Sequence, residues 1–287
     1  MNTIHQQYGN KKTVALPPLS PHKLLFVGLI HAVALLVVPI LLWKHTFTVS
    51  WYSIGLTLIW FILGSTAITG GYHRLFSHHT YSANWLLRLF YVLWGATAFQ
   101  GSARQWSAQH LDHHRYVDTE KDPYNINFGF WFAHIGWVIR KTNPDYSLVG
   151  DIDKDPIARF QHQYYYPIAF IGCFALPAAI AALWGELWAG LLIAGFLRLC
   201  VQWHMTFCVN SVAHTWGMQR FSKKNTARGS WWLAFLTWGE MDHNYHHKYP
   251  RDFRTGTRWW DFDPAKWFIW LCALLRIAWG LKRSRHA

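Results

Sequence analysis

The chain has 287 residues, of which 52% are hydrophobic, 18% aromatic and only 14% charged, whereas globular domains carry roughly 25% charged residues. This composition excludes a disordered chain and argues against a soluble domain, because only a membrane gives so much apolar surface a favourable environment. The formal net charge of +13 suits anionic lipid, an acidic partner or nucleic acid. The long apolar segments argue against nucleic acid.

Four apolar segments are long enough to cross a membrane, which takes about 20 mostly apolar residues. They form two pairs, and we expect each pair to be a tight hairpin, linked by residues 44–50 in the first and by Glu186 alone in the second. The first span follows a polar stretch with Lys11, Lys12 and Lys23 and is too long for the apolar core of a signal peptide, so we interpret it as retained. The predicted spans are 24–43, 51–70, 167–185 and 187–209.

Four shorter apolar runs contain Arg or His or are too short to span. We predict that they form helices at the membrane interface or packed inside the protein; these runs are 85–99, 128–139, 231–239 and 267–280. The cysteines show no CxxC spacing, so we expect small buried hydrophobic residues rather than disulfides or a thiolate cluster. They are Cys173, Cys200, Cys208 and Cys272.

The Lys and Arg residues are unevenly distributed: three precede residue 24, nine lie in 71–166, thirteen follow residue 209, and the two hairpin links together have one. Positive residues favour the cytoplasmic side, so both termini and both long polar segments are expected to face the cytoplasm, at the inner membrane if the source is bacterial. The predicted fold is an all-α integral membrane protein of one domain. Its expected parts are a cytosolic N-terminal segment (1–23), transmembrane hairpins (24–70 and 167–209) and a helical cytosolic cap (71–166 and 210–287).

Nine of the 18 histidines gather in four motifs of the predicted cap. Two motifs have the form HxxHH, and positions i, i+3 and i+4 share one helical face, so we expect each to aim three imidazoles in one direction. His73 and His78 are five residues apart, about 140° on an ideal helix, and can share a site only across a helix end or an irregular turn. Asn210 and His214 lie one turn apart. The clustered histidines are His73, His78, His110, His113, His114, His214, His243, His246 and His247.

This histidine set predicts metal binding. Nine imidazoles exceed the three or four protein ligands of one zinc ion, so two metals with four or five ligands each fit better. Asp112, Glu240 and Asp242 are candidate acceptors for the outer imidazole N–H groups. His204 is a candidate for an inner cavity and His134 for an outer hydrogen bond. The isolated histidines are interpreted as structural, namely His5, His22, His31, His45, His162 and His286.

The ordered motifs HxxxxH, HxxHH, NxxxH and HxxHH resemble those of the integral-membrane fatty-acid desaturases, most closely the acyl-CoA type that acts at the ninth carbon. The similarity extends to the sequence around each motif and covers roughly residues 24–267; it includes 71–78, 113–125, 134–137, 210–214 and 239–250. The resemblance implies two irons in the cap, held by the nine clustered histidines, with Asn210 reaching one iron through water and dioxygen as co-substrate. It also implies that Gln100, Trp106 and Thr206 bend an acyl chain in a tunnel, although ordinary core packing would explain them as well.

The function implied is oxygen-dependent insertion of a cis double bond into a saturated long-chain acyl-CoA, acyl-carrier-protein thioester or acyl lipid. The sequence has no His-Pro-Gly-Gly haem segment, paired CxxC or GxGxxG, so the expected electron donor is external: a ferredoxin or a b-type cytochrome with its NAD(P)H reductase. The basic residues after residue 209 suit such an acidic donor or anionic membrane lipid. Alternatives are a lipid hydroxylase of the same fold, a zinc-dependent membrane hydrolase of lipid amides, and a metal transporter or sensor. The histidines fall outside the spans, which argues against the last.

Overall fold

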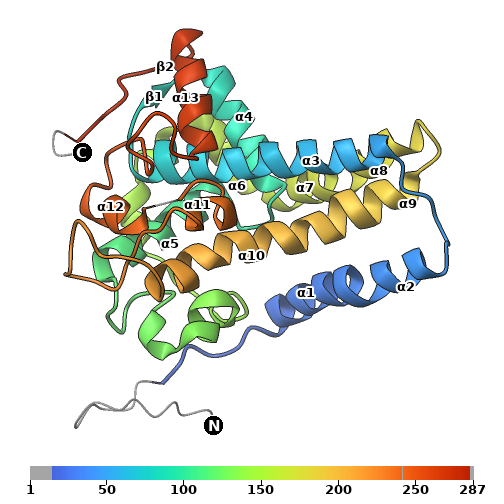
Figure 1. Cartoon of the computed structure of the whole chain (residues 1–287), viewed down its shortest axis with the longest axis horizontal. Coiled ribbons are helices and arrows are strands. Elements are labelled where there is room, and N and C mark those ends of the chain that lie inside the picture. The colour runs from blue at the N-terminus through green and yellow to red at the C-terminus, as the bar shows by residue number, and fades with distance from the viewer. Residues whose placement is uncertain (1–14, 241, 285–287) are drawn as a thin grey trace.

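The computed structural model describes residues 15–240 and 242–284 (Figure 1). Within these ranges, four helices are long and apolar enough to cross a membrane: Pro21–Trp43, Trp51–Ser77, Tyr165–Ala182 and Leu187–His214. Four spans and a mostly helical fold were predicted from the sequence, and both are confirmed by this architecture. Lys11 and Lys12, the expected structural residues His5 and His286, and both chain ends lie outside the described residues.

Each spanning helix contains a π-helical stretch. The elements of the four spans are α1 (Pro21–Ala32), η1 (Val33–Val37) and α2 (Val38–Trp43); α3 (Trp51–Thr66) and η2 (Ala67–Ser77); α7 (Tyr165–Phe170), η7 (Ile171–Ala175) and α8 (Leu176–Ala182); and α9 (Leu187–Ala189), η8 (Gly190–Leu197), α10 (Arg198–Ser211) and the 3-10 turn η9 (Val212–His214). The second and fourth spans therefore continue past residues 70 and 209, where the sequence placed their ends, and carry His73 and His214, while His78 directly follows the second span.

The remaining elements surround one end of the spanning helices (Figure 1). They are β1 (Ser82–Ala83), α4 (Trp85–Ala96), α5 (Ala103–Tyr116), η3 (Ile126–Phe128), η4 (Phe132–Gly136), η5 (Tyr146–Val149), η6 (Ile152–Lys154), α6 (Pro156–Gln163), α11 (Leu233–Leu236), α12 (His243–Lys248), α13 (Pro264–Leu274) and β2 (Ala278–Trp279). Strands β1 and β2 pair antiparallel, with Ser82 opposite Trp279. Of the four shorter apolar runs, 85–99 and 267–280 contain α4 and most of α13. In 128–139 and 231–239 the helical elements, η4 and α11, are much shorter than predicted.

The fourth span lies between the first and the second, which the sequence did not anticipate (Figure 1). On one side, Leu199 and Trp203 of α10 pack in one apolar cluster with Ile30 of α1. On the other, the Gln202 amide donates a hydrogen bond to the Ser65 hydroxyl of α3 at 3.1 Å. The expected tight first hairpin is therefore wrong, because the 44–50 link is long enough to let another helix pack between its two spans.

The second pair does form a tight hairpin. A Cβ on Gly190 would lie 2.4 Å from the Pro177 carbonyl oxygen, so only glycine permits this approach of the two spans. At the same end of the bundle, the Glu186 carboxylate accepts hydrogen bonds from the Ser50 backbone N–H at 3.0 Å and from the Ser53 hydroxyl at 2.6 Å. This carboxylate ties the two interhelical links together.

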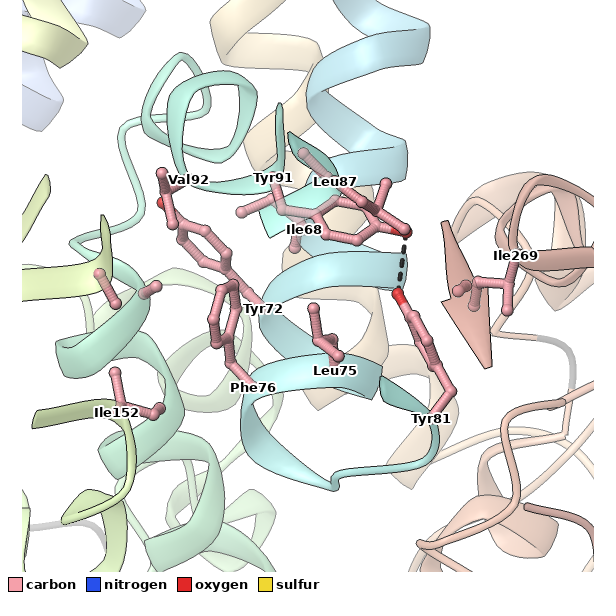
Figure 2. Packing of buried hydrophobic residues seen from close by; sticks show 14 of the residues in the cluster. Ile68, Tyr72, Leu75, Phe76, Tyr81, Leu87, Tyr91, Val92, Ile152 and Ile269 are labelled. Carbon is pink, nitrogen blue, oxygen red and sulfur yellow. Dashed lines mark hydrogen bonds between the residues drawn. The ribbon is translucent and has the colours of Figure 1, made fainter. Parts of the chain in front are cut away.

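The main apolar core joins η2 to α4 and α13 (Figure 2). The hydroxyls of Tyr81 and Tyr91 hydrogen-bond at 2.8 Å, shown as the dashed line in Figure 2. A Cβ on Gly71 would lie 2.4 Å from the ring of Tyr91, and one on Gly95 would lie 2.4 Å from the ring of Tyr72. The two glycines thus let the aromatic rings pack into the interface that holds η2 in place. The four cysteines are free and buried, as predicted.

Candidate metal centre

The first histidine motif lies at the end of the π-helix η2. The His78 backbone N–H donates to the His73 carbonyl at 3.2 Å, closing a wide turn of the i to i+5 type. In this geometry a five-residue spacing returns to the same face, and the two imidazole centroids are 5.0 Å apart. The sequence required an irregular turn or a helix end for these two rings to meet, and the structure supplies both.

The two HxxHH motifs lie on helices α5 and α12, whose N-termini are capped by side chains. The Ser102 hydroxyl caps α5 by accepting the Gln105 backbone N–H at 3.2 Å, and the Asp242 carboxylate caps α12 by accepting the Tyr245 N–H at 3.0 Å. The three imidazoles of each motif do not point to one place. The first and third point to one candidate metal site, and the second points to another. Positions i and i+4 differ by about 40° around a helix, whereas i+3 lies about 100° from i+4. The prediction that each motif aims three rings in one direction is therefore wrong.

The nine imidazoles converge into two groups, in each of which the nearest ring nitrogens lie within 4.8 Å of one another. Neighbouring Nε2 atoms are as close as 2.7 Å, between His78 and His110, and as far as 3.3 Å, between His113 and His247. The five-histidine group is His73, His78, His110, His114 and His246, and the four-histidine group is His113, His214, His243 and His247. Each group could hold one metal ion. Asn210 belongs to neither group and lines the same cavity as His243.

Three of these imidazoles are oriented by hydrogen bonds at their outer nitrogens. His73 Nδ1 lies 3.2 Å from the Glu240 carboxylate, and His113 Nδ1 lies 2.8 Å from Asp122. His214 Nδ1 lies 2.7 Å from the Thr226 hydroxyl, which itself donates to a carboxylate, that of Asp118, at 2.6 Å. All three partners accept, so each Nδ1 carries the proton and each Nε2 presents a lone pair to its group.

The sequence identified only one of these acceptors. Glu240 was predicted, whereas Asp122 and the Thr226 hydroxyl were missed, although Asp122 lies inside the 113–125 segment that follows the second motif. The predictions for Asp112 and Asp242 are wrong. Asp112 accepts the Asp145 backbone N–H at 2.9 Å, and Asp242 caps α12. Asp112 lies two residues after a ligand candidate, which places it on another face of α5.

Burial favours the neutral form of several of these imidazoles. Burial lowers the pKa of His110, His114 and His246 well below the ordinary histidine value, and charge on neighbouring imidazoles would lower it further. The same causes lower the pKa of His247. Neutral imidazole is a good ligand for zinc, copper, iron and nickel. A cation bound by each group would use the lone pairs that now face one another, so the donor set fits two such metals.

A cavity of about 510 Å³ connects the histidine groups with the spanning helices. It is lined by histidines of both groups, including His73 and His243, and by apolar residues such as Phe99, Phe170 and Trp203. Histidine donors and a hydrophobic passage therefore share one space. This arrangement can hold a long apolar molecule against a pair of metal sites.

Three residues singled out in the sequence meet on the wall of this cavity. The Trp106 indole N–H donates to Gln100 Oε1 at 3.2 Å, and the Gln100 amide donates to the Thr206 hydroxyl at 2.9 Å. The three come from α5, the loop before it and α10, so the tertiary fold assembles them into one chain of hydrogen bonds across the cavity wall.

The family model and the related proteins that this chain matches are all described as desaturases. Residues 49–274 match the family model described as fatty acid desaturase. The chain is 45% identical to a "Probable acyl-CoA desaturase" of Schizosaccharomyces pombe over 78% of its own length and 48% of the relative's. It is 35% identical to "Delta(9)-fatty-acid desaturase fat-5" of Caenorhabditis elegans, covering 87% of this chain and 76% of that protein.

"Stearoyl-CoA desaturase 5" of Bos taurus is 36% identical over 80% of this chain and 72% of its own. The chain spans about half the length of the yeast relative. The family model matches most of the chain, and two of these relatives are covered over more than two thirds of their length. With four spanning helices and two converging histidine groups, the chain belongs to the fatty acid desaturase family.

Proposed function

We propose that this protein is an oxygen-dependent acyl-CoA desaturase that inserts a cis double bond at the ninth carbon of a saturated long-chain acyl group. One observation carries the proposal: a single cavity is lined both by the two histidine groups and by aromatic residues of the spanning helices. An apolar chain held there would place one methylene pair beside the metal sites. The names of the related desaturases support acyl-CoA as the substrate and the ninth carbon as the position.

The nine clustered histidines would hold two Fe²⁺ ions, with five imidazoles at one and four at the other. Asn210, which lines the same cavity as His243, would reach the second iron through water. When bound, the metals supply the activation of dioxygen that removal of hydrogen from an unactivated methylene requires. The chain itself contributes oriented Nε2 lone pairs, since Glu240, Asp122 and Thr226 hold three of the outer nitrogens.

The hydrogen-bonded chain Trp106–Gln100–Thr206 would position the acyl group. These residues line the cavity, and a wall held in a fixed shape would select which methylene pair lies at the metals. The Trp106 indole and the Gln100 amide are hydrogen-bonded within this chain, and the Thr206 hydroxyl donates to the Gln202 carbonyl at 3.1 Å, so an apolar substrate need not pair with them.

The number of electrons consumed in each turnover shows that the reaction needs an electron donor. One turnover removes two hydrogen atoms from the acyl chain and reduces one dioxygen to two waters, and so consumes two further electrons and two protons. We propose that a ferredoxin or a b-type cytochrome with its NAD(P)H reductase delivers these electrons. The thirteen basic residues after residue 209 would attract an acidic donor or anionic membrane lipid. The same distribution of basic residues supports a multi-pass orientation with the histidine end and both termini in the cytoplasm.

The test is reconstitution of the purified protein in lipid with stearoyl-CoA, iron, dioxygen and a reductase chain, followed by mass-spectrometric analysis of the acyl product. The expected product is a cis-9 monounsaturated chain that forms only with iron and oxygen. A hydroxylated chain without an alkene would establish the same-fold hydroxylase instead. Activity with zinc and without oxygen would establish the lipid hydrolase.

A further inference from the structure

A third group of metal-binding side chains lies apart from the nine clustered histidines. His31 of α1 and Cys200 and His204 of α10 bring two imidazole nitrogens and one sulfur within 4.8 Å of one another. The Nε2 atoms of the two histidines are 3.0 Å apart. This separation falls within the 2.7 to 3.3 Å seen between Nε2 atoms in the two candidate metal groups. The two helices that meet here belong to the first and fourth spans.

The hydrogen bonds around this pair determine which ring nitrogens carry protons. His31 Nδ1 lies 2.7 Å from the Val27 carbonyl oxygen, which can only accept, so the proton of a neutral His31 is on Nδ1. The Nε2 atom of His31 then presents a lone pair toward His204.

The other side of the pair is fixed in the same way through His134. The Ser211 hydroxyl donates to the Phe207 carbonyl at 2.9 Å and therefore accepts from His134 Nδ1 at 2.8 Å. The remaining nitrogen of a neutral His134, Nε2, must accept from His204 Nδ1 at 2.9 Å. His204 Nε2 is thereby left with a lone pair that faces the lone pair of His31.

Two lone pairs 3.0 Å apart repel unless a cation lies between them. We propose that His31, His204 and Cys200 form a third metal site that binds a thiophilic cation of the zinc type and joins the first span to the fourth. Two imidazoles and one thiolate are a ligand set of zinc, which leaves a fourth position for another ligand. Cys200 would release its proton on binding, because the thiolate is the ligand. The outer nitrogens of both imidazoles are already oriented, as metal-bound histidines require.

The site would hold α1 in place beside the cavity. Val27, whose carbonyl orients His31, lines the cavity together with Phe26. Only 22% of the most apolar stretch of the first span is buried, compared with 56% for the second and fourth, so packing holds less of this span than of the other two. A metal clamp between α1 and α10 would therefore stabilise one wall of the cavity.

The experiment uses Co²⁺ as a spectroscopic probe on the full-length protein in lipid nanodiscs. A thiolate ligand gives Co²⁺ an intense charge-transfer band in the near ultraviolet, which all-imidazole sites lack. The band is expected in the wild type and to disappear in Cys200→Ser, His31→Gln and His204→Gln. Cys208→Ser is the matched control, because Cys208 is also a buried, free cysteine of α10, and it should keep the band.

Metal analysis of the zinc-supplied protein gives a second readout that does not depend on catalysis. The wild type and Cys208→Ser should bind about one more equivalent of zinc per chain than Cys200→Ser and His31→Gln do. Absence of the thiolate band in a folded wild type, or its persistence in both histidine variants, would overturn the proposal. If the two imidazoles share a proton instead of binding a metal, the thiolate band will be absent from the folded wild type.

Discussion

The bond between His113 and Asp122 provides a stringent test of how the four-histidine group is organised. Both residues are buried, and Asp122 accepts three hydrogen bonds: from His113 Nδ1 at 2.8 Å, from the Tyr124 N–H at 3.1 Å and, through its other oxygen, from the Asp118 N–H at 3.0 Å. In Asp122→Asn one of the two oxygens becomes an NH₂ group. Whichever way the amide is turned, a donor then faces a donor. In one orientation the hydrogen bond to His113 is lost, and in the other it is weakened because the acceptor no longer carries a negative charge.

Loss of such an outer partner typically lowers metal affinity about 10- to 100-fold, which corresponds to roughly 1.4 to 2.8 kcal/mol at 1.4 kcal/mol per tenfold. We expect Asp122→Asn to lose the metal of the four-histidine group at a lower chelator concentration than the wild type, while the five-histidine group keeps its metal. The assay is metal content per chain during a chelator titration, read by mass spectrometry, with desaturase turnover measured in parallel.

Asp112→Asn is the matched control. Asp112 is also buried and near the same histidines, but its carboxylate accepts the Asp145 backbone N–H at 2.9 Å rather than an imidazole. An asparagine can keep that bond, so metal retention should be unchanged. Equal metal retention by wild type and Asp122→Asn, or equal metal loss from both variants, would refute the assignment of Asp122 as the residue that orients His113.

Three further substitutions probe the histidines, the core and the cavity. His246→Ala should remove one imidazole from the five-histidine group and abolish turnover while membrane insertion is retained; near-wild-type product would contradict the two-metal interpretation. Gly71→Ala should lower the free energy of unfolding by about 1–3 kcal/mol, because its Cβ would lie 2.4 Å from the Tyr91 ring. Gly28→Ala, whose Cβ would meet nothing within 4 Å, is its control in thermal unfolding, and equal melting temperatures would argue against the clash. Gln100→Leu breaks both hydrogen bonds of the cavity wall and should give double bonds at more than one position, detected by mass spectrometry of the acyl product. A single unchanged position would mean that Gln100 only packs.

The sequence by itself determined the membrane spans and the set of clustered histidines. Spans are readable because bilayer thickness requires a continuous apolar run, which composition alone reveals. The clusters are readable because each lies within a few residues along the chain. The spacing of His73 and His78 required a helix end or an irregular turn, and the pair lies at the end of the π-helix η2. The fatty acid desaturase family could likewise be identified from the order of the motifs and is confirmed by the family model.

Only the tertiary structure decided how these pieces meet. The division of each HxxHH motif between two groups depends on the rotation of α5 and α12 about their own axes, which local spacing does not fix. Asp122 and Thr226 orient imidazoles that lie 9 and 12 residues away along the chain, and the insertion of the fourth span between the first two depends on packing between distant helices. Long-range packing brings His31 to His204, 173 residues later. The sequence therefore contained the ligand types, whereas their grouping and their hydrogen-bond partners depend on three-dimensional contacts.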